Sequence, residues 1–110
     1  MENLLNQMGK RIFERRKQLR LTQEESAKRA SITPQTVSSA ELGKKALRPE
    51  NIIRIVAALE LSTDYLLLGK VTYEDYSKLS LKIFDLSPTQ YRHLEEIINS
   101  FIIALHEKEI

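Results

Sequence analysis

Apolar residues recur along this chain at spacings of three and four, and the alternation typical of strands is scarce. This rhythm predicts amphipathic helices nearly throughout and indicates no strand. A first helix is expected over about residues 3–19, with Met8, Ile12 and Leu19 on one stripe. Arg16 lies four residues after Ile12 and three before Leu19, so it shares this stripe. The pattern therefore places a charged side chain on the face that packs into the core.

Two short helices follow, each with its own start signal. Thr22 and Glu25 match a capping box, in which each side chain satisfies a free backbone N–H of the other, so a helix is expected to begin at Gln23. Thr33 is the natural N-cap of the next helix, because Pro34 suits the first helical position, where no N–H is needed.

Two further start signals complete a bundle of five helices over residues 1–69. Pro49 begins a fourth helix after the basic loop 44–48, and Ser62 caps a short fifth helix that a glycine at 69 ends. The five expected helices span about residues 3–19, 23–29, 34–42, 49–59 and 63–68.

Residues 70–110 have a different character and form a helical extension. Thr72 with Asp75 is a capping pair that opens a helix to about residue 84, and a Ser-Pro-x-Gln start at 87–90 opens a last one. In the last helix, apolar residues follow the a/d rhythm of a helix that packs along a partner helix. These residues are Tyr91, Leu94, Ile98, Phe101 and Leu105.

Composition narrows the function classes. The chain of 110 residues suits one compact domain with an appendage. It has no cysteine and two histidines, so we expect neither disulfides nor a zinc cluster, and no metal or other cofactor. The start of the chain lacks the apolar segment of a signal peptide, and no apolar run approaches the ~20 residues that span a bilayer. We therefore expect a soluble, cytoplasmic protein without a membrane partner.

Charge is unevenly distributed along the chain. Residues 1–70 carry 13 Lys and Arg against 8 Asp and Glu, whereas residues 71–110 carry 4 against 7, within a net charge of +2. The basic part is where an anionic partner would bind.

The two short helices at 23–29 and 34–42, joined by a tight turn and preceded by a longer helix, form a helix-turn-helix arrangement. Residues 8–68 resemble the lambda-repressor-like family of regulators, also called the xenobiotic-response-element family. The resemblance rests on Arg15-Arg16-Lys17, Leu21-Thr22-Gln23-Glu24-Glu25, Ile32-Thr33, Val37, Glu41-Leu42-Gly43-Lys44, Pro49 and Leu61-Ser62-Thr63-Asp64-Tyr65-Leu66. It implies an all-α, five-helix DNA-binding bundle. The apolar stripe of the extension at 70–110, which lies outside the resemblance, predicts a dimerisation role for that segment.

The resemblance also implies roles for individual residues on double-stranded DNA. The base contacts would come from Gln35, Thr36 and Ser39, with Ser38 nearby, and glutamine can bond bidentately to adenine. The backbone contacts would come from Thr22, Gln23, Thr33, Lys44, Lys45 and Arg48. For Gln23 a second role is open, in which its amide braces a side chain of the third helix. Arg16 and Glu41 would pair in the interior as a structural ion pair, and Ile32, Val37 and Ala40 would belong to the core.

Three positions depart from the family pattern. Ser31 occupies the turn position where glycine is usual, so a non-glycine residue must adopt the left-handed conformation. Pro34 and Leu42 occupy positions where polar side chains are common in the family. The motif therefore has fewer side chains that can form hydrogen bonds with DNA. Because the outer face of the recognition helix has no Arg or Lys, guanine readout is disfavoured, and we expect an A·T-leaning half-site read partly through DNA shape.

The favoured function is a homodimeric repressor that binds a palindromic operator through the major groove, with the stripe of the last helix as the dimer interface. A two-fold dimer would place two recognition helices about 34 Å apart. Packing of the extension on its own bundle is the alternative for the stripe, and activation would use the same fold.

A second function class is a protein-interaction module, antitoxin-like or an adaptor, with weak or lost DNA binding, which Pro34 and Leu42 favour. No small-molecule ligand is inferred. Catalysis is not expected, because His93 and His106 both fall in the last helix without a nucleophile at a meaningful spacing.

Overall fold

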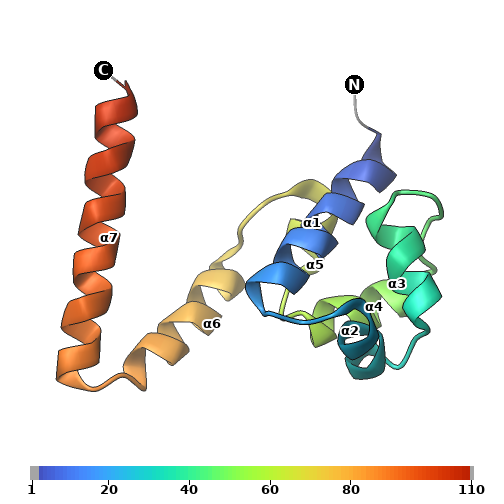
Figure 1. Ribbon diagram of the computed structural model, residues 1–110, viewed down its shortest axis with the longest axis horizontal. Helices are drawn as coiled ribbons and strands as arrows, with labels where there is room; N and C mark the ends of the chain where they lie inside the picture. The colour runs from blue at the N-terminus through green and yellow to red at the C-terminus, as the bar shows by residue number, and fades with distance from the viewer. Residues whose placement is uncertain (1–2, 110) are drawn as a thin grey trace. The chain divides into compact units, whose positions relative to one another are not determined.

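The computed structural model describes residues 3–109, with side chains to residue 107, and every regular element in this part of the chain is a helix. The all-α fold is therefore confirmed (Figure 1). The helices are α1 (Leu4–Gln18), α2 (Gln23–Ala30), α3 (Pro34–Glu41), α4 (Pro49–Ala58), α5 (Thr63–Leu68), α6 (Tyr73–Phe84) and α7 (Pro88–Glu109). Residues 1, 2 and 110, the outer ends of the two expected domains, lie outside the described residues.

The backbone contacts divide the chain into two compact units, Met1–Asp75 and Tyr76–Ile110. The first unit holds α1 to α5 and the first turn of α6. The second holds the rest of α6 and α7.

The helix starts follow the local signals in the sequence. The Thr22 hydroxyl accepts from the backbone N–H of Glu25 at 3.0 Å, and the Glu25 carboxylate accepts from the backbone N–H of Thr22 at 2.9 Å, so the capping box is complete. These bonds hold the pKa of the exposed Glu25 carboxyl below its usual value. Thr33 caps α3 through the backbone N–H of Thr36, and Ser62 caps α5 through that of Tyr65.

Between α2 and α3, the backbone adopts the left-handed conformation at Ser31, with φ 56° and ψ 41°. This confirms the expectation that a non-glycine residue tolerates this geometry. Arg20 and Glu60 also have positive φ, at the ends of α1 and α4, which the sequence analysis did not anticipate. Each such residue costs about 1–2 kcal/mol, which the packing of the bundle offsets.

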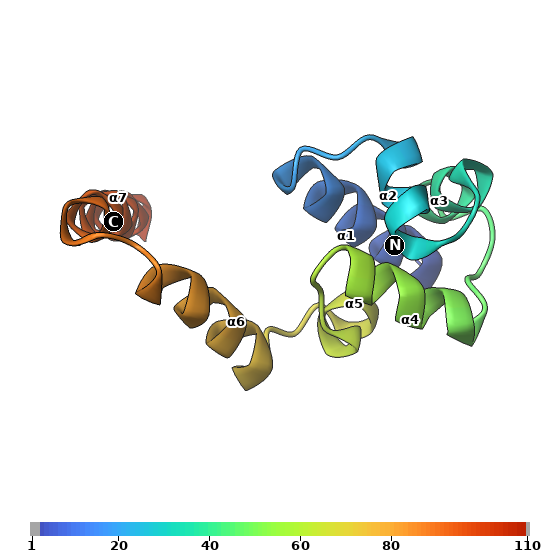
Figure 2. The same ribbon diagram turned by 90° about the horizontal axis from the view of Figure 1, so that it is seen from below.

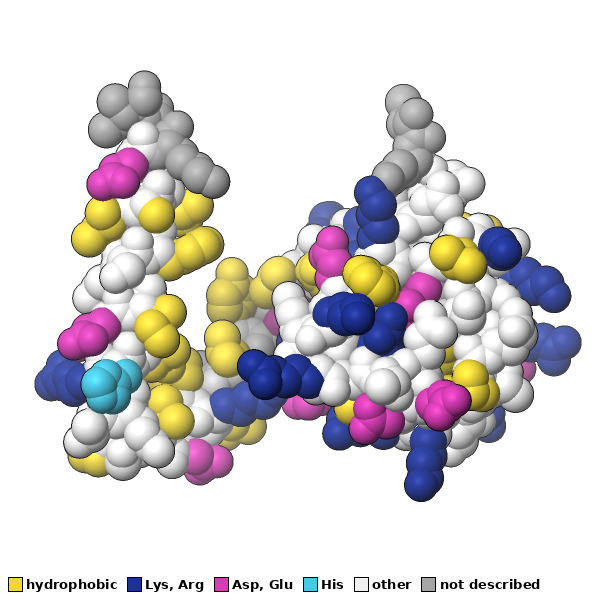
Figure 3. Space-filling view, in the orientation of Figure 1, with side chains coloured by type: hydrophobic (Ala, Val, Ile, Leu, Met, Phe, Trp, Pro, Cys, Tyr) yellow, Lys and Arg dark blue, Asp and Glu magenta, His cyan; other side chains and the backbone are white. Residues whose placement is uncertain are grey.

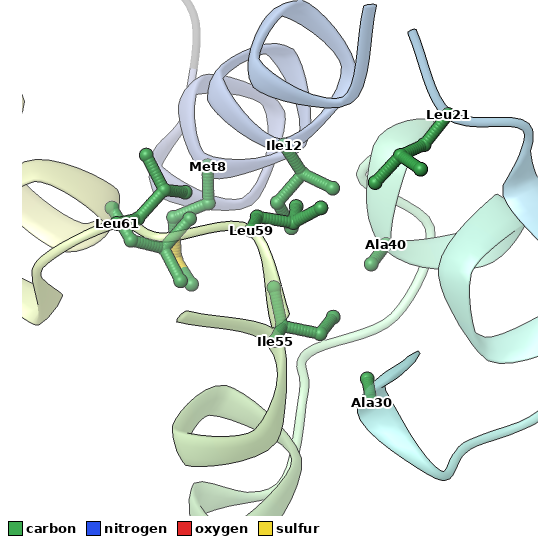
Figure 4. Packing of buried hydrophobic residues seen from close by; sticks show 9 residues of the cluster. Met8, Ile12, Leu21, Ala30, Ala40, Ile55, Leu59 and Leu61 are labelled. Carbon is green, nitrogen blue, oxygen red and sulfur yellow. The ribbon is translucent and has the colours of Figure 1, made fainter. Parts of the chain in front are cut away.

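The core of the first unit lies between the helices α1 to α5 (Figure 4). Its buried apolar residues include Met8, Ile12, Leu21, Ala30, Ala40, Ile55, Leu59, Leu61 and Leu66. At Gly9 α1 approaches α3 so closely that an added Cβ would lie 2.5 Å from the carbonyl oxygens of Ala40 and Glu41. Glycine therefore sets the spacing of these two helices.

Two arginines of α1 satisfy carbonyls at the ends of other helices. Arg15 Nε donates to the Leu59 carbonyl at 2.9 Å, and Arg11 Nη1 donates to the Leu66 carbonyl at 3.0 Å. The last carbonyls of a helix lack partners within it and carry partial negative charge. The cations of α1 thus close the ends of α4 and α5.

Over its described residues, the second unit has no interior of its own. None of the side chains described at 76–107 is buried, and Figure 3 shows hydrophobic side chains gathered along α7. The predicted start of α7 is present, because the Ser87 hydroxyl accepts from the backbone N–H of Gln90 at 3.2 Å. Among the described residues, no helix is long and apolar enough to cross a membrane.

Candidate nucleic-acid interface

The helices α2 and α3 pack side by side (Figure 2). On α3, Val37 and Ala40 are buried with 1% and 5% of their surface exposed, which turns the opposite face of the helix to solvent. Ile32, in the turn before α3, packs against the core. The expected core residues of this motif are therefore confirmed, and Gln35 lies on the exposed face.

A concavity of ≈ 560 Å³ lies between α3, the loop that follows it and the start of α4. Its lining residues are Gln35, Thr36, Ser39, Lys45, Ala46, Leu47, Arg48, Glu50, Asn51 and Arg54. The structure thus brings three of the predicted base-contacting residues together with two of the predicted backbone-contacting cations. The charged residues of the lining are three cations and one carboxylate, so the concavity favours an anionic partner.

Hydrogen bonds on α3 link the side chains that face this concavity to their neighbours. Gln35 Nε2 donates to the Ser39 hydroxyl at 3.4 Å, a long bond between exposed groups. The Thr36 hydroxyl lies 2.8 Å from the Thr33 hydroxyl, at the N-cap of the helix. The Gln35 amide is therefore weakly held and accessible, whereas the Thr36 hydroxyl belongs to the cap.

Other predicted contact residues do not line the concavity. Ser38 is half-buried on α3, and Lys44 is exposed at the start of the loop. Thr22 and Thr33 are exposed at the N-caps of α2 and α3, where helix N-termini offer free N–H groups. The roles of these residues on DNA stay predictions.

An ion pair anchors α3 to α1. Arg16 Nε donates to Glu41 Oε2 at 2.6 Å and Arg16 Nη2 to Glu41 Oε1 at 3.0 Å, and the two side chains are only 8% and 5% exposed. A third bond joins Arg16 Nη1 to the Leu21 carbonyl at 2.9 Å. The hydrogen bonds to Glu41 raise the pKa of Arg16 despite burial, so the guanidinium keeps its charge. The predicted interior pair is present.

The same carboxylate ties α2 to this pair. Gln23 Nε2 donates to Glu41 Oε1 at 3.0 Å, so the amide braces a side chain of α3, one of the two roles that were left open for it. An amide nitrogen has two N–H groups, and the bond to Glu41 uses one of them. Contact of Gln23 with a phosphate stays a prediction.

The contribution of α4 to the concavity was not predicted from the sequence. Glu50, Asn51 and Arg54 lie within the first two turns of α4, for which the sequence predicted a helix but no contact with a partner. The available signal was their spacing, since residues at i, i+1 and i+4 from position 50 share the polar side of a helix that begins at Pro49.

Comparisons with known proteins match this unit. The model of a family described as Helix-turn-helix matches residues 12–66. The P22 c2 repressor, solved in complex with a synthetic operator, is 35% identical with a TM-score of 0.56, over 57% of this chain and 96% of that one. The controller protein C.AhdI from Aeromonas hydrophila is 27% identical with a TM-score of 0.55, over 56% and 94%.

One further likeness reaches beyond the matched segment. A chain of the SinR/SinI protein complex covers 84% of this chain and 94% of its own length at 22% identity, with a TM-score of 0.54, which is a likeness of fold alone. No curated protein matches the sequence.

Proposed function

The chain belongs to the helix-turn-helix family of DNA-binding transcriptional regulators, and from this premise we propose that it is a homodimeric repressor of a palindromic operator. The observation that carries the proposal is the concavity beside α3, which gathers Gln35, Thr36 and Ser39 with Lys45 and Arg48. Side chains that can bond base edges lie there next to cations that can bond phosphates. The P22 c2 repressor, a similar protein, was solved with an operator bound.

In this proposal α3 enters the major groove with Gln35 as its main specificity residue. The weak bond from Gln35 to Ser39 is easily exchanged for a bidentate bond to adenine, worth about 1–3 kcal/mol of discrimination. Thr36, Ser39 and the nearby Ser38 face neighbouring bases. The backbone contacts come from Thr22, Gln23, Thr33, Lys44, Lys45 and Arg48, which give salt-dependent affinity without reading sequence.

The proposed dimer forms through α7. Its apolar stripe stays open to solvent in the single chain, with Tyr91 42%, Ile98 44% and Phe101 63% exposed. Leu94 and Leu105 extend the stripe at the a/d spacing of a helix that packs on another helix. A second copy supplies the matching stripe, and the two-fold pair presents two recognition helices to a palindrome.

The test is selection of bound duplexes from a random DNA pool at two salt concentrations, with the full chain and with Gln35→Ala. We expect an A·T-leaning palindrome with the full chain. Gln35→Ala should lose preference at one position of each half-site and keep the rest.

A matched control is Gln18→Ala, which removes an exposed amide at the end of α1, outside the concavity. This variant should select the same palindrome as the full chain. Recovery of no duplex above background at low salt would refute the repressor proposal.

One observation favours a second function. Leu42, directly after α3, is 60% exposed, an apolar group at a position suited to a protein partner. In that case the chain is an antitoxin-like or adaptor protein. A stable complex with a different chain, in the absence of any duplex affinity, would identify this function.

We further infer a cytoplasmic protein without catalytic activity. Operator DNA is in the cytoplasm of a bacterial cell, and family members act by occupying DNA. Duplex binding that proceeds without chemical change to the DNA is the corresponding measurement.

A further inference from the structure

The start of α4 forms one wall of the concavity, facing the recognition helix. Three polar residues of α4 lie there, Glu50, Asn51 and Arg54, and α3 contributes Gln35 and Ser39 to the lining. In the proposed function these α4 residues have no role. Because these α4 residues line the same concavity as the predicted base-contacting side chains, they would contact the same partner.

We propose that this concavity holds one strand of the operator duplex and that Arg54 binds a phosphate of that strand, with Asn51 beside it. The inference rests on the proposed function, because it concerns the same DNA interface. It adds α4 to α2 and α3, the helices that contribute DNA contacts in the proposed function.

The position of the Arg54 guanidinium supports this role. Arg54 is exposed, and its Nη1 donates to the Ser31 carbonyl at 3.4 Å, so the head group reaches from α4 to the turn that leads into α3. A guanidinium has five N–H donors in a planar fork. The long bond to Ser31 uses one donor, and the fork matches two oxygens of a phosphate.

The charges of the lining favour a polyanion. Lys45 and Arg48 come from the loop and Arg54 from α4, all three are exposed, and Glu50 is the single carboxylate of the lining. Cations on two separate elements can neutralise successive phosphates along a strand.

The lining argues against a small-molecule pocket. Such pockets are mostly apolar, whereas here Ala46 and Leu47 are the only apolar residues of the lining. The same concavity holds the predicted base-contacting side chains of α3 and the cations of the loop and α4. A DNA strand has bases for the first group and phosphates for the second, so it is the occupant that we propose.

The experiment measures the affinity of the full chain for the selected operator and for a scrambled duplex over a series of salt concentrations. Arg54→Gln removes the charge and keeps a hydrogen-bonding side chain, whereas Arg54→Lys keeps the charge. Arg29→Gln is the matched control, because Arg29 is exposed on α2 and does not line the concavity. Thermal unfolding of each variant reports whether the fold is retained.

We expect Arg54→Gln to weaken binding to both duplexes by a similar factor, on the order of tenfold at low salt. The slope of log affinity against log salt should fall by about 0.9 for each half-site, or about 1.8 for the dimer. Arg54→Lys should keep the slope, and Arg29→Gln should keep both affinity and slope. The selected sequence should be unchanged, since a phosphate contact carries no sequence information.

Other outcomes overturn the inference. Wild-type affinity and slope in Arg54→Gln would exclude the phosphate contact and leave the proposed function intact. A loss of affinity with unchanged slope, shared by Arg54→Lys, would mean that Arg54 only supports the Ser31 turn. Absence of salt-dependent duplex binding by the unaltered chain would refute the proposed function itself, and this inference with it.

Discussion

Glu41 joins three helices through one buried carboxylate. It accepts two hydrogen bonds from Arg16 on α1 and one from Gln23 on α2, while its own backbone ends α3. The Glu41 side chain therefore links α3 to both α1 and α2. The sequence indicated the pair through the inward position of Arg16 and the family resemblance, both of which depend on a few residues.

Glu41→Ala is expected to lower the free energy of unfolding by about 3–5 kcal/mol, because the Arg16 guanidinium is left buried without its counter-charge. Urea denaturation followed by circular dichroism measures the loss. Replacing both partners, Arg16→Met with Glu41→Leu, should cost much less than the single change. An equal or larger loss in the double variant would contradict this account.

Ser26 contrasts with Glu41, because its polar group is buried without a hydrogen bond in the part of the chain that the structure describes. Its side chain is almost fully buried on α2, and its Oγ has no hydrogen-bond partner among the described residues. An unsatisfied buried hydroxyl costs about 1–3 kcal/mol. Ser26→Ala should therefore raise the free energy of unfolding by about 1 kcal/mol.

The check is to measure the thermal unfolding of Ser26→Ala and of Thr22→Ala and to compare their changes in stability. Thr22→Ala removes a capping hydroxyl of the same helix and should destabilise the chain by about 1 kcal/mol. Destabilisation of both variants to the same extent would mean that the Ser26 hydroxyl has a partner.

At the scale of elements, α1 organises the bundle. It packs on α3 at Gly9 and closes the ends of α4 and α5 with Arg15 and Arg11. A helix that makes these contacts sets the spacing of α1 and α3 and joins α1 to the ends of α4 and α5.

Gly9→Ala tests this packing, since two effects of the change oppose each other. Alanine favours a helix by about 1 kcal/mol over glycine. The added Cβ, however, would lie 2.5 Å from two backbone carbonyls of α3, which cannot move aside as a flexible side chain can. We expect a net loss of about 1–3 kcal/mol in urea denaturation, and a gain in stability would refute the close approach.

The helix boundaries were predictable because their signals are local. Thr22 with Glu25, Thr33 with Pro34, and Ser87 with Gln90 each lie within three residues of one another, so the sequence displays both partners of a cap. The bonds from Arg11 and Arg15 to distant carbonyls join residues 55 and 44 positions apart, and no spacing indicates them. The wall that α4 adds to the concavity was missed although its polar spacing was visible, because the sequence does not show that this side of α4 lies beside α3.

At the scale of the whole molecule, the two units differ in what holds them together. The first has a buried core, whereas the second has no buried side chain among its described residues. Large exposed apolar patches are typical of interaction surfaces, and the apolar stripe of α7 is such a patch.

The dimer proposal predicts that Phe101→Glu gives a monomer in sedimentation experiments, because a carboxylate at the centre of the stripe would be buried without a partner. Operator affinity should fall by about 10²–10⁴, the gain that a linked second half-site provides. Ile103→Glu is the matched control, because Ile103 is 59% exposed on α7 and lies two residues from Phe101, on another face. A dimer that survives Phe101→Glu would place the interface elsewhere.

The open stripe of α7 also bears on how the regulator responds to its own abundance. When most chains are single, the number of pairs grows with the square of the number of chains. Halving the protein in a dividing cell would then leave about a quarter of the pairs to occupy the operator. In the proposed dimer, occupancy of the operator would thus fall more steeply than the amount of protein.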